Sequence, residues 1–225
     1  MKDSDSVEWS IDAGGRHTTA VLERATSGSS GAVFVCAHGA GGHMADRGML
    51  RLTETLRSAG LDVVRFNFFY RERGSKRPDP MPLLQECVAA VVARTRHEME
   101  PRVLIMGGRS MGGRAASMLA ARGHACDGLL LFAYPLHPAG KPDRLRSAHL
   151  PAIAVPVLCF NGTRDALCRR DLMDNVLSAV TTRWDMHWLE GADHGFHVLR
   201  SSGTSDAELL DEVGDVSQRW VAGLA

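Results

Sequence analysis

The stretch "RVLIMGGRSMGGRAASMLAA", residues 102–121, combines an apolar run, a serine flanked by glycines and an alanine-rich segment. The apolar run is typical of a buried strand, and the segment after the serine is typical of a helix. The glycines between them indicate a turn too tight for larger side chains. We therefore expect Ser110 to lie at a sharp strand-to-helix turn, with Gly108 and Gly112 small because they approach each other closely.

The rest of the chain alternates between strand and helix patterns. Strands are predicted at 7–11, 19–23, 32–37, 62–70, 102–107, 128–134, 156–162 and 184–190, the first two as a hairpin-like pair. Helices are predicted at 46–59, 83–98, 110–122 and 171–180, with a last one carrying Leu209, Val213, Val216 and Trp220. Such alternation, with unbroken apolar strands, predicts an α/β fold: one domain over residues 1–225 with a mostly parallel central sheet covered on both faces.

Composition excludes several classes of protein. The 225 residues include 26 basic and 26 acidic ones, so no bulk charge attracts nucleic acid or an anionic membrane. No apolar run approaches the roughly 20 residues of a membrane span, and the polar N-terminus has no apolar signal segment. The five cysteines show no CxxC spacing. We therefore expect a cytoplasmic protein with reduced thiols, no metal site and no cofactor.

Ligands of such sheets bind beyond the carboxyl ends of the strands, so the residues that follow each strand are the candidates for chemistry. Ser110, Asp165 and His194 each follow a predicted strand. Residues 108–112 fit the pattern G-x-S-x-G, in which a strained turn exposes a nucleophilic serine. The alternative is a serine that only caps the helix. The order Ser, Asp, His along the chain favours the nucleophile.

The remaining roles follow from what a serine nucleophile requires. A base must accept its proton, and His194 is preferred over His197, which is expected to start the next segment. Asp165 is preferred over Asp193 as the acid that orients the base, because side chains of adjacent residues usually diverge. For the oxyanion, we expect the backbone N–H groups of Met111 and of Ala40 in "HGAGG", residues 38–42. His38 is expected to brace that loop.

The motifs "HGAGG", "FNFFYRERG", "GGRSMGGRAA", "AYPLHPAGKPDRLR", "FNGTRD" and "GADHGF" carry a resemblance over most of the chain. The sequence resembles an α/β-hydrolase of the dienelactone-hydrolase-like kind. It is similar more closely to the α/β-hydrolase-like domain named for an NSL-complex subunit and a testis-expressed protein. The resemblance implies the α/β-hydrolase fold and the triad of Ser110, Asp165 and His194. Dienelactone hydrolases use a cysteine nucleophile, so Ser110 counts against dienelactone as the substrate.

Substrate contacts are predicted from the same edge of the sheet. After the strand at 62–70, the segment "YRERGSKRP" gathers Arg71, Arg73, Lys76 and Arg77. Either this is a solvated loop, or Arg71 pairs with an anionic group of the substrate. Tyr70 and Arg109 are the other expected substrate contacts. The segment from Tyr134 to Pro156 is too short for a large lid.

The sequence therefore predicts a metal-free serine hydrolase that cleaves a small-molecule ester or thioester through an acyl-enzyme. Amide or peptide hydrolysis would use the same residues, and a non-catalytic binding module could keep the same fold. No nucleic-acid or membrane partner is expected. The acyl group, the leaving group and the oligomeric state stay open.

Overall fold

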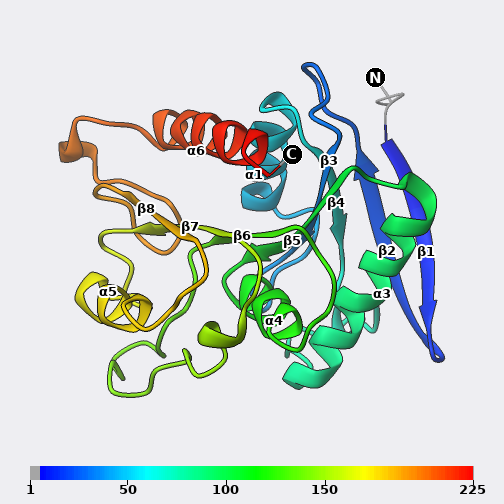
Figure 1. Ribbon diagram of the computed structural model, residues 1–225, viewed down its shortest axis with the longest axis horizontal. Coiled ribbons are helices and arrows are strands. Elements are labelled where there is room, and N and C mark those ends of the chain that lie inside the picture. The colour runs from blue at the N-terminus through cyan, green and yellow to red at the C-terminus, as the bar shows by residue number, and fades with distance from the viewer. Residues whose placement is uncertain (1–5, 225) are drawn as a thin grey trace.

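The computed structural model describes residues 6–224, which form a twisted sheet of eight strands (Figure 1). Their order across the sheet is β1-β2-β4-β3-β5-β6-β7-β8. The strands from β4 to β8 in this order pair in parallel, which confirms the mostly parallel sheet predicted from the alternation. The bounds are β1 Ser6–Ala13, β2 Arg16–Glu23, β3 Ala32–Ala37, β4 Asp62–Phe66, β5 Val103–Arg109, β6 Gly128–Phe132, β7 Val157–Gly162 and β8 Trp184–Leu189.

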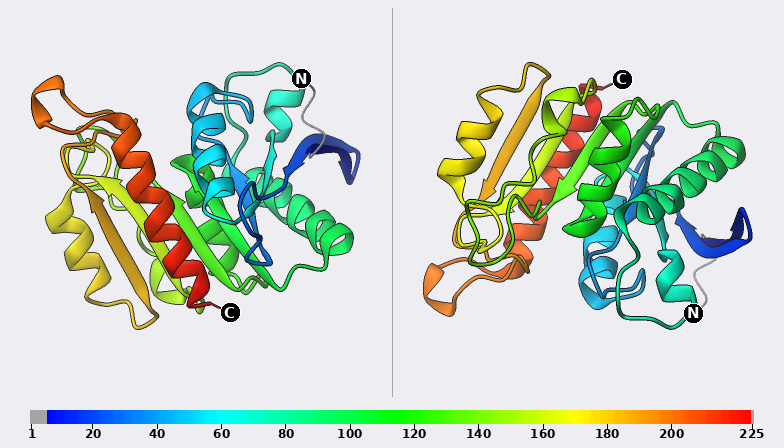
Figure 2. Two further views of the ribbon diagram at one scale, coloured as in Figure 1. Left: turned by 90° about the horizontal axis from the view of Figure 1, so that it is seen from above. Right: turned by 90° about the horizontal axis from the view of Figure 1, so that it is seen from below.

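Helices cover both faces of the sheet, as the two views in Figure 2 show. Helices α1 (Arg47–Ser58) and α6 (Asp206–Ala222) pack together on one face, and α3 (Met81–Met99), α4 (Met111–Ala120) and α5 (Arg170–Leu177) lie on the other. Two apolar clusters result, one on each side of the strands. No helix between residues 6 and 224 has the length and apolar character needed to cross a membrane.

The opening hairpin is confirmed, because β1 and β2 pair antiparallel from Ser6 opposite Glu23 to Ala13 opposite Arg16. The predicted strand at 62–70 is wrong in its second half. Strand β4 ends at Phe66, where its pairing with Ala37 of β3 also ends, and Phe69–Glu72 form the short helix α2. Residues 68–70 are as buried as the strand itself, so hydrophobicity alone could not distinguish the two parts.

The connection between β6 and β7 crosses the carboxyl edge of the sheet without building a domain of its own. Its only regular element is the 3-10 helix η1 (Leu150–Ala152). The hydroxyl of Tyr134 donates to the carbonyl of Arg146 at 2.8 Å and holds the segment against the body of the protein. The absence of a large lid from the described residues agrees with the prediction.

All five cysteines are buried free thiols: Cys36, Cys87, Cys126, Cys159 and Cys168. Burial raises the pKa of the Cys36 and Cys87 thiols to about 12. These side chains are thus protonated apolar groups of the core.

Candidate active site

Ser110 occupies the turn between β5 and α4. Its backbone has φ 50° and ψ −115°, a conformation that non-glycine residues rarely adopt. The turn is fixed on one side by the bond from the Ser110 amide to the carbonyl of Phe132, at 2.8 Å. The side chain makes no capping hydrogen bond with α4, so the helix-cap alternative has no support in the contacts of this serine.

The glycines around Ser110 are required by contacts with neighbouring strands. A Cβ atom on Gly108 would collide with the backbone of Ala37, and one on Gly112 would lie 2.6 Å from the carbonyl oxygens of Ala37 and His38. The predicted reason for their size was therefore incomplete. Both residues are small because β3 passes beside the turn, and it is Gly113 that approaches the Gly108 carbonyl.

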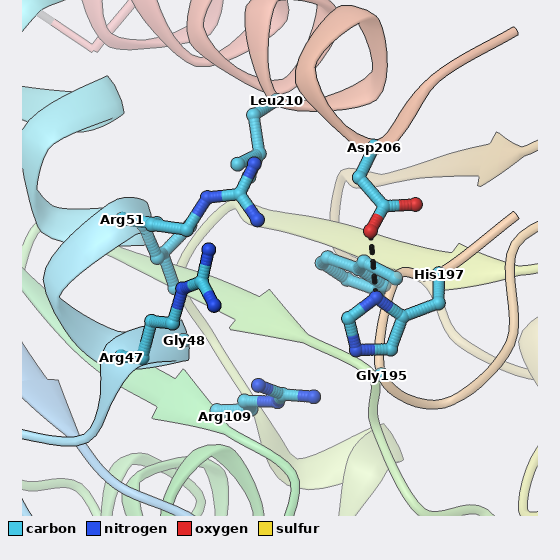
Figure 3. Close-up of a pocket in the computed structure, with 10 residues that line it drawn as sticks. Arg47, Gly48, Arg51, Arg109, Gly195, His197, Asp206 and Leu210 are labelled. Carbon is cyan, nitrogen blue, oxygen red and sulfur yellow. Dashed lines mark hydrogen bonds and ion pairs between the residues drawn. The ribbon is translucent and has the colours of Figure 1, made fainter.

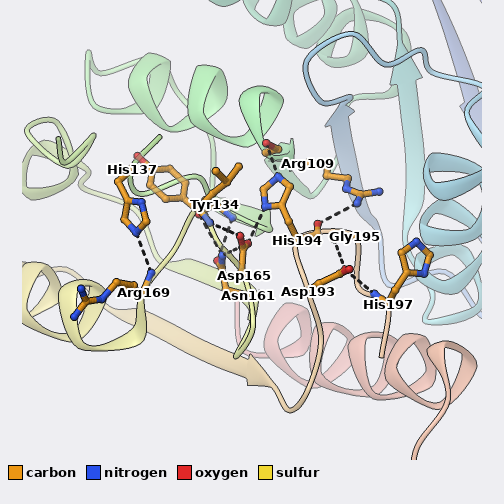
Figure 4. Close-up of polar contacts among 12 residues, drawn as sticks. Arg109, Tyr134, His137, Asn161, Asp165, Arg169, Asp193, His194, Gly195 and His197 are labelled. Atoms are coloured by element: carbon orange, nitrogen blue, oxygen red, sulfur yellow. Dashed lines mark hydrogen bonds and ion pairs between the residues drawn. The ribbon is translucent and has the colours of Figure 1, made fainter. Parts of the chain in front are cut away.

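A continuous chain of hydrogen bonds joins Ser110, His194 and Asp165. The Ser110 Oγ lies 3.0 Å from Nε2 of His194, and Nδ1 of the same ring lies 2.8 Å from Oδ2 of Asp165 (Figure 4). The three residues come from the loops after β5, β8 and β7. The fold thus places all three at the carboxyl ends of parallel strands, within reach of one another.

Asp165 is held in one orientation by the backbone and by a second side chain. Its Oδ1 accepts from the Leu167 amide at 2.8 Å, and its Oδ2 also accepts from Asn161 Nδ2 at 3.1 Å. Asn161 is itself tied to both backbone groups of Tyr134. The Asp165 side chain is fully buried, so these donors replace the water that a carboxylate needs. Sequence analysis missed Asn161, although a buried asparagine in the apolar strand "VLCFNG" is the signal that could have found it.

The rival acid and base make different contacts. Asp193 Oδ1 accepts from the amides of Gly195 and His197, at 2.7 and 3.0 Å, and so closes the turn that carries His194 (Figure 4). His197 Nδ1 bonds Oδ2 of Asp206 at 2.7 Å, at the first residue of α6. Neither Asp193 nor His197 hydrogen-bonds Ser110, Asp165 or His194 in residues 6–224.

Ala40 borders the cavity at Ser110, and Met111 is the residue after the serine. This cavity has a volume of about 380 Å³ and is also lined by Arg109, Leu167 and His194, among others. The amides of Ala40 and Met111 donate no hydrogen bond to another described residue. Both are therefore available to a ligand, and that of Met111 is at the N-terminus of α4, where the helix dipole favours negative charge.

His38 braces the loop after β3, as predicted. It is fully buried, its Nδ1 donates to the Gly39 carbonyl at 2.8 Å, and its Nε2 accepts from the Phe68 amide at 3.2 Å. Burial lowers the pKa of this imidazole to about 4. His38 is therefore neutral near pH 7, with each ring nitrogen engaged.

Of the three expected substrate contacts, only Arg109 borders the cavity at Ser110. Tyr70 is fully buried, with its ring stacked on Phe68 at a centroid distance of 6.2 Å. Arg71 donates to the carbonyl of Ser75 at 3.1 Å, within its own loop. The structure thus brings Arg109 to the site and leaves Tyr70 and Arg71 outside the lining of that cavity.

Comparison with solved structures shows the same fold in several hydrolases. An alpha-beta serine hydrolase homologue from Coxiella burnetii has a TM-score of 0.76 and 19% identity, over 95% of this chain and 96% of that one. A serine hydrolase without a lid from Xanthomonas campestris has a TM-score of 0.75 and 20% identity, covering 98% and 97%. A dienelactone hydrolase from Anabaena variabilis has a TM-score of 0.71 and 19% identity, covering 96% and 97%. Residues 30–222 match the family described as "Alpha/beta hydrolase domain", and the chain therefore belongs to this family.

Proposed function

We propose that this protein is a serine hydrolase that cleaves a small ester or thioester through an acyl-enzyme, with Ser110 as nucleophile. The observation that carries the proposal is the unbroken chain of hydrogen bonds from Asp165 through His194 to Ser110. Family membership adds support, as does the strained backbone that presents the serine. The closer resemblance to the domain named for an NSL-complex subunit stays a prediction, and it does not indicate a substrate.

The chemistry assigns one task to each residue. His194 Nε2 takes the proton of Ser110 as Oγ attacks the carbonyl carbon, and later returns it to the leaving group. Asp165 accepts from Nδ1, fixes the tautomer and stabilises the imidazolium. The amides of Ala40 and Met111 donate to the oxyanion. Water then attacks the acyl-enzyme with the same base, and Ser110 regains its proton.

The open site favours small substrates over large lipids. No helical element covers the cavity of about 380 Å³, so interfacial activation by a lid has no structural counterpart in the described residues. The same apparatus would serve amides, but these leave less readily than the alkoxide or thiolate of an ester or thioester. Esters and thioesters are therefore the first class to assay.

Labelling with a fluorophosphonate probe and hydrolysis of p-nitrophenyl esters test the proposal. Ser110→Ala should abolish labelling and leave only the residual catalysis of about 10³–10⁴-fold over water that other triad enzymes retain. The matched control is Ser117→Ala, because the Ser117 Oγ also meets a histidine, His149 Nε2, at 2.8 Å but is fully buried. Labelling that survives in Ser110→Ala, or disappears only in Ser117→Ala, would contradict the assignment.

A further inference from the structure

A second cavity, of about 450 Å³, adjoins the cavity at Ser110. The two share Gly48 and Arg109 in their linings. Figure 3 shows the guanidinium groups of Arg47, Arg51 and Arg109 facing this space, with His197 and Asp206 across from them. A ligand group in the second cavity would therefore lie next to a bond being cleaved at Ser110.

The charges of this cavity are unbalanced. Arg47 and Arg51 stand four residues apart on α1, on one face of the helix. Among residues 6–224, no carboxylate lies within 4.0 Å of the guanidinium nitrogens of Arg47, Arg51 or Arg109. The one acid in the lining, Asp206, accepts from His197 Nδ1 at 2.7 Å and from the Val198 amide at 3.0 Å. Asp206 also interacts with the charge of Arg51. Three guanidinium groups still face one carboxylate, so the lining keeps a net positive charge.

The Arg109 side chain is held in place by contacts within the protein. Its Nη2 donates to the carbonyl of His194 at 3.1 Å. A Cβ atom on Gly48 would lie 2.9 Å from its Nη1, so the guanidinium packs closely against α1 at this glycine. Arg109 also precedes Ser110 directly in the chain. A positioned arginine loses little rotamer entropy when it binds an anion.

The cavity also has an apolar part, formed by Leu52, Phe196 and Leu210. An inorganic ion alone would leave these side chains without a partner. A ligand that carries an anionic group on a short hydrocarbon chain would contact both the arginines and this apolar wall. Guanidinium groups hold carboxylate and phosphate in the same forked geometry.

We propose that Arg47, Arg51 and Arg109 form a subsite for an anionic group, carboxylate or phosphate, carried by the ester substrate. The inference rests on the proposed function, because it places this group beside a scissile bond at Ser110. Binding at this subsite positions the ester and performs no chemistry, so its loss affects KM more than kcat. The substrate class is thus an ester of an anionic small molecule.

The test compares matched neutral and anionic esters with the wild type and with the double variant Arg47→Gln/Arg51→Gln. Glutamine removes the charge and keeps good helix propensity. Two pairs place the carboxylate on either side of the bond: p-nitrophenyl hemisuccinate with p-nitrophenyl butyrate, and 4-acetoxybenzoate with its methyl ester. For at least one anionic ester, KM should rise about tenfold while kcat/KM for the neutral partner stays within about twofold.

Arg122→Gln is the control variant. Arg122 is exposed and follows the far end of α4, about 15 Å along the helix from Ser110. It should leave both members of each pair unchanged. The discrimination by the wild type should also shrink at high salt, since an exposed charge such as Arg47 is screened. A merely structural role of the arginines would lower the rates with neutral and anionic esters equally, and that result would overturn the subsite.

A readout that needs no turnover separates this inference from the proposed function. Inorganic phosphate should raise the Tm of Ser110→Ala, and the added substitutions Arg47→Gln/Arg51→Gln should remove the shift. If esters are cleaved at Ser110 but show neither charge discrimination nor phosphate-dependent stabilisation, the subsite fails and the hydrolase stands. If the wild type cleaves no ester and yet phosphate stabilises only the protein with intact arginines, the hydrolase fails and the anion site stands.

Discussion

Two histidine–aspartate pairs begin three residues apart in the loop after β8, and their hydrogen bonds are nearly identical. His194 Nδ1 lies 2.8 Å from Asp165, and His197 Nδ1 lies 2.7 Å from Asp206. Their surroundings differ. The Asp165 side chain is 0% exposed and that of His194 30%, whereas His197 is 66% exposed and Asp206 32%. The second ring nitrogen of His194 meets Ser110, while that of His197 has no hydrogen-bond partner in residues 6–224.

The comparison teaches that a histidine–aspartate hydrogen bond does not by itself make the histidine a candidate base. A buried acid with fixed donors cannot rotate away, so it holds one tautomer of His194 and points the free nitrogen at the serine. An exposed pair is screened by water and contributes little energy. His197 and Asp206 instead anchor the start of α6, where Asp206 also accepts from the Val198 amide.

The largest expected effect separates the two histidines. His194→Ala should lower kcat for a neutral p-nitrophenyl ester on the order of 10⁶-fold, the size found when the histidine of another serine-hydrolase triad is removed. His197→Ala should lower kcat by less than about tenfold, because it loses only an exposed hydrogen bond to Asp206. Steady-state kinetics with an active-site titration measures both. Comparable losses in the two variants would break the distinction.

The next effect compares the acids. Asp165→Asn should lower kcat about 10⁴-fold, because an amide cannot hold the tautomer that leaves Nε2 free to accept from Ser110. Asp206→Asn and Asp193→Asn serve as matched controls, since Asn keeps an oxygen able to accept from the amides that these residues bind. Both controls should keep kcat within about tenfold of the wild type. A larger loss in Asp193→Asn than in Asp165→Asn would reassign the orienting acid.

The smallest expected effect concerns His38, a histidine that is not hydrogen-bonded to an acid within residues 6–224, and the dependence of the free energy of unfolding on pH. Burial lowers the pKa of His38 from 6.5 to about 4, so between these pH values the unfolded chain binds a proton that the native protein does not. Stability must then fall as pH decreases through this window, by on the order of 3 kcal/mol from this residue. Urea unfolding at pH 7 and pH 4.5 measures the change.

His38→Gln is the variant for this measurement, because its amide oxygen can replace Nε2 as acceptor for Phe68. The variant should lose less stability than the wild type between the two pH values. The His149 imidazole, whose pKa burial also lowers to about 4, is present in both proteins and cancels from the difference. An equal loss in both proteins would show that His38 does not titrate in this way.

Much of this arrangement could be predicted because it depends on local pattern. Unbroken apolar runs mark the parallel strands, and parallel strands bring the residues that follow them to one edge. That rule places Ser110, Asp165 and His194 together without any knowledge of their distances. The end of β4 could not be predicted. Phe68 and Phe69 are buried like the strand residues before them, so the hydrophobic pattern does not distinguish strand from helix there.

Contacts between residues that are distant in the chain could not be predicted from the sequence either. Asn161 gains its role by bonding Asp165 and Tyr134 at once, and Arg47 and Arg51 become part of a cavity only because α1 and the loop after β8 lie side by side. The charged loop after β4 drew attention through composition, yet Arg71 and Arg73 find partners nearby, in Ser75 and Asp79. The role of Arg71 in substrate binding stays a prediction, and the proposed subsite rests on packing between distant segments and not on local charge density.

Because all five thiols are buried, an introduced cysteine could be labelled selectively with a thiol reagent. Thiol reagents react with a cysteine that is exposed and in the thiolate form. The buried cysteines meet neither condition: Cys36, Cys87, Cys126, Cys159 and Cys168. In a Ser110→Cys variant, the new thiol beside His194 would be the single fast-reacting cysteine of the folded chain. One equivalent of iodoacetamide or of a spectroscopic thiol label would then count the folded molecules and report on the turn between β5 and α4 from a known position.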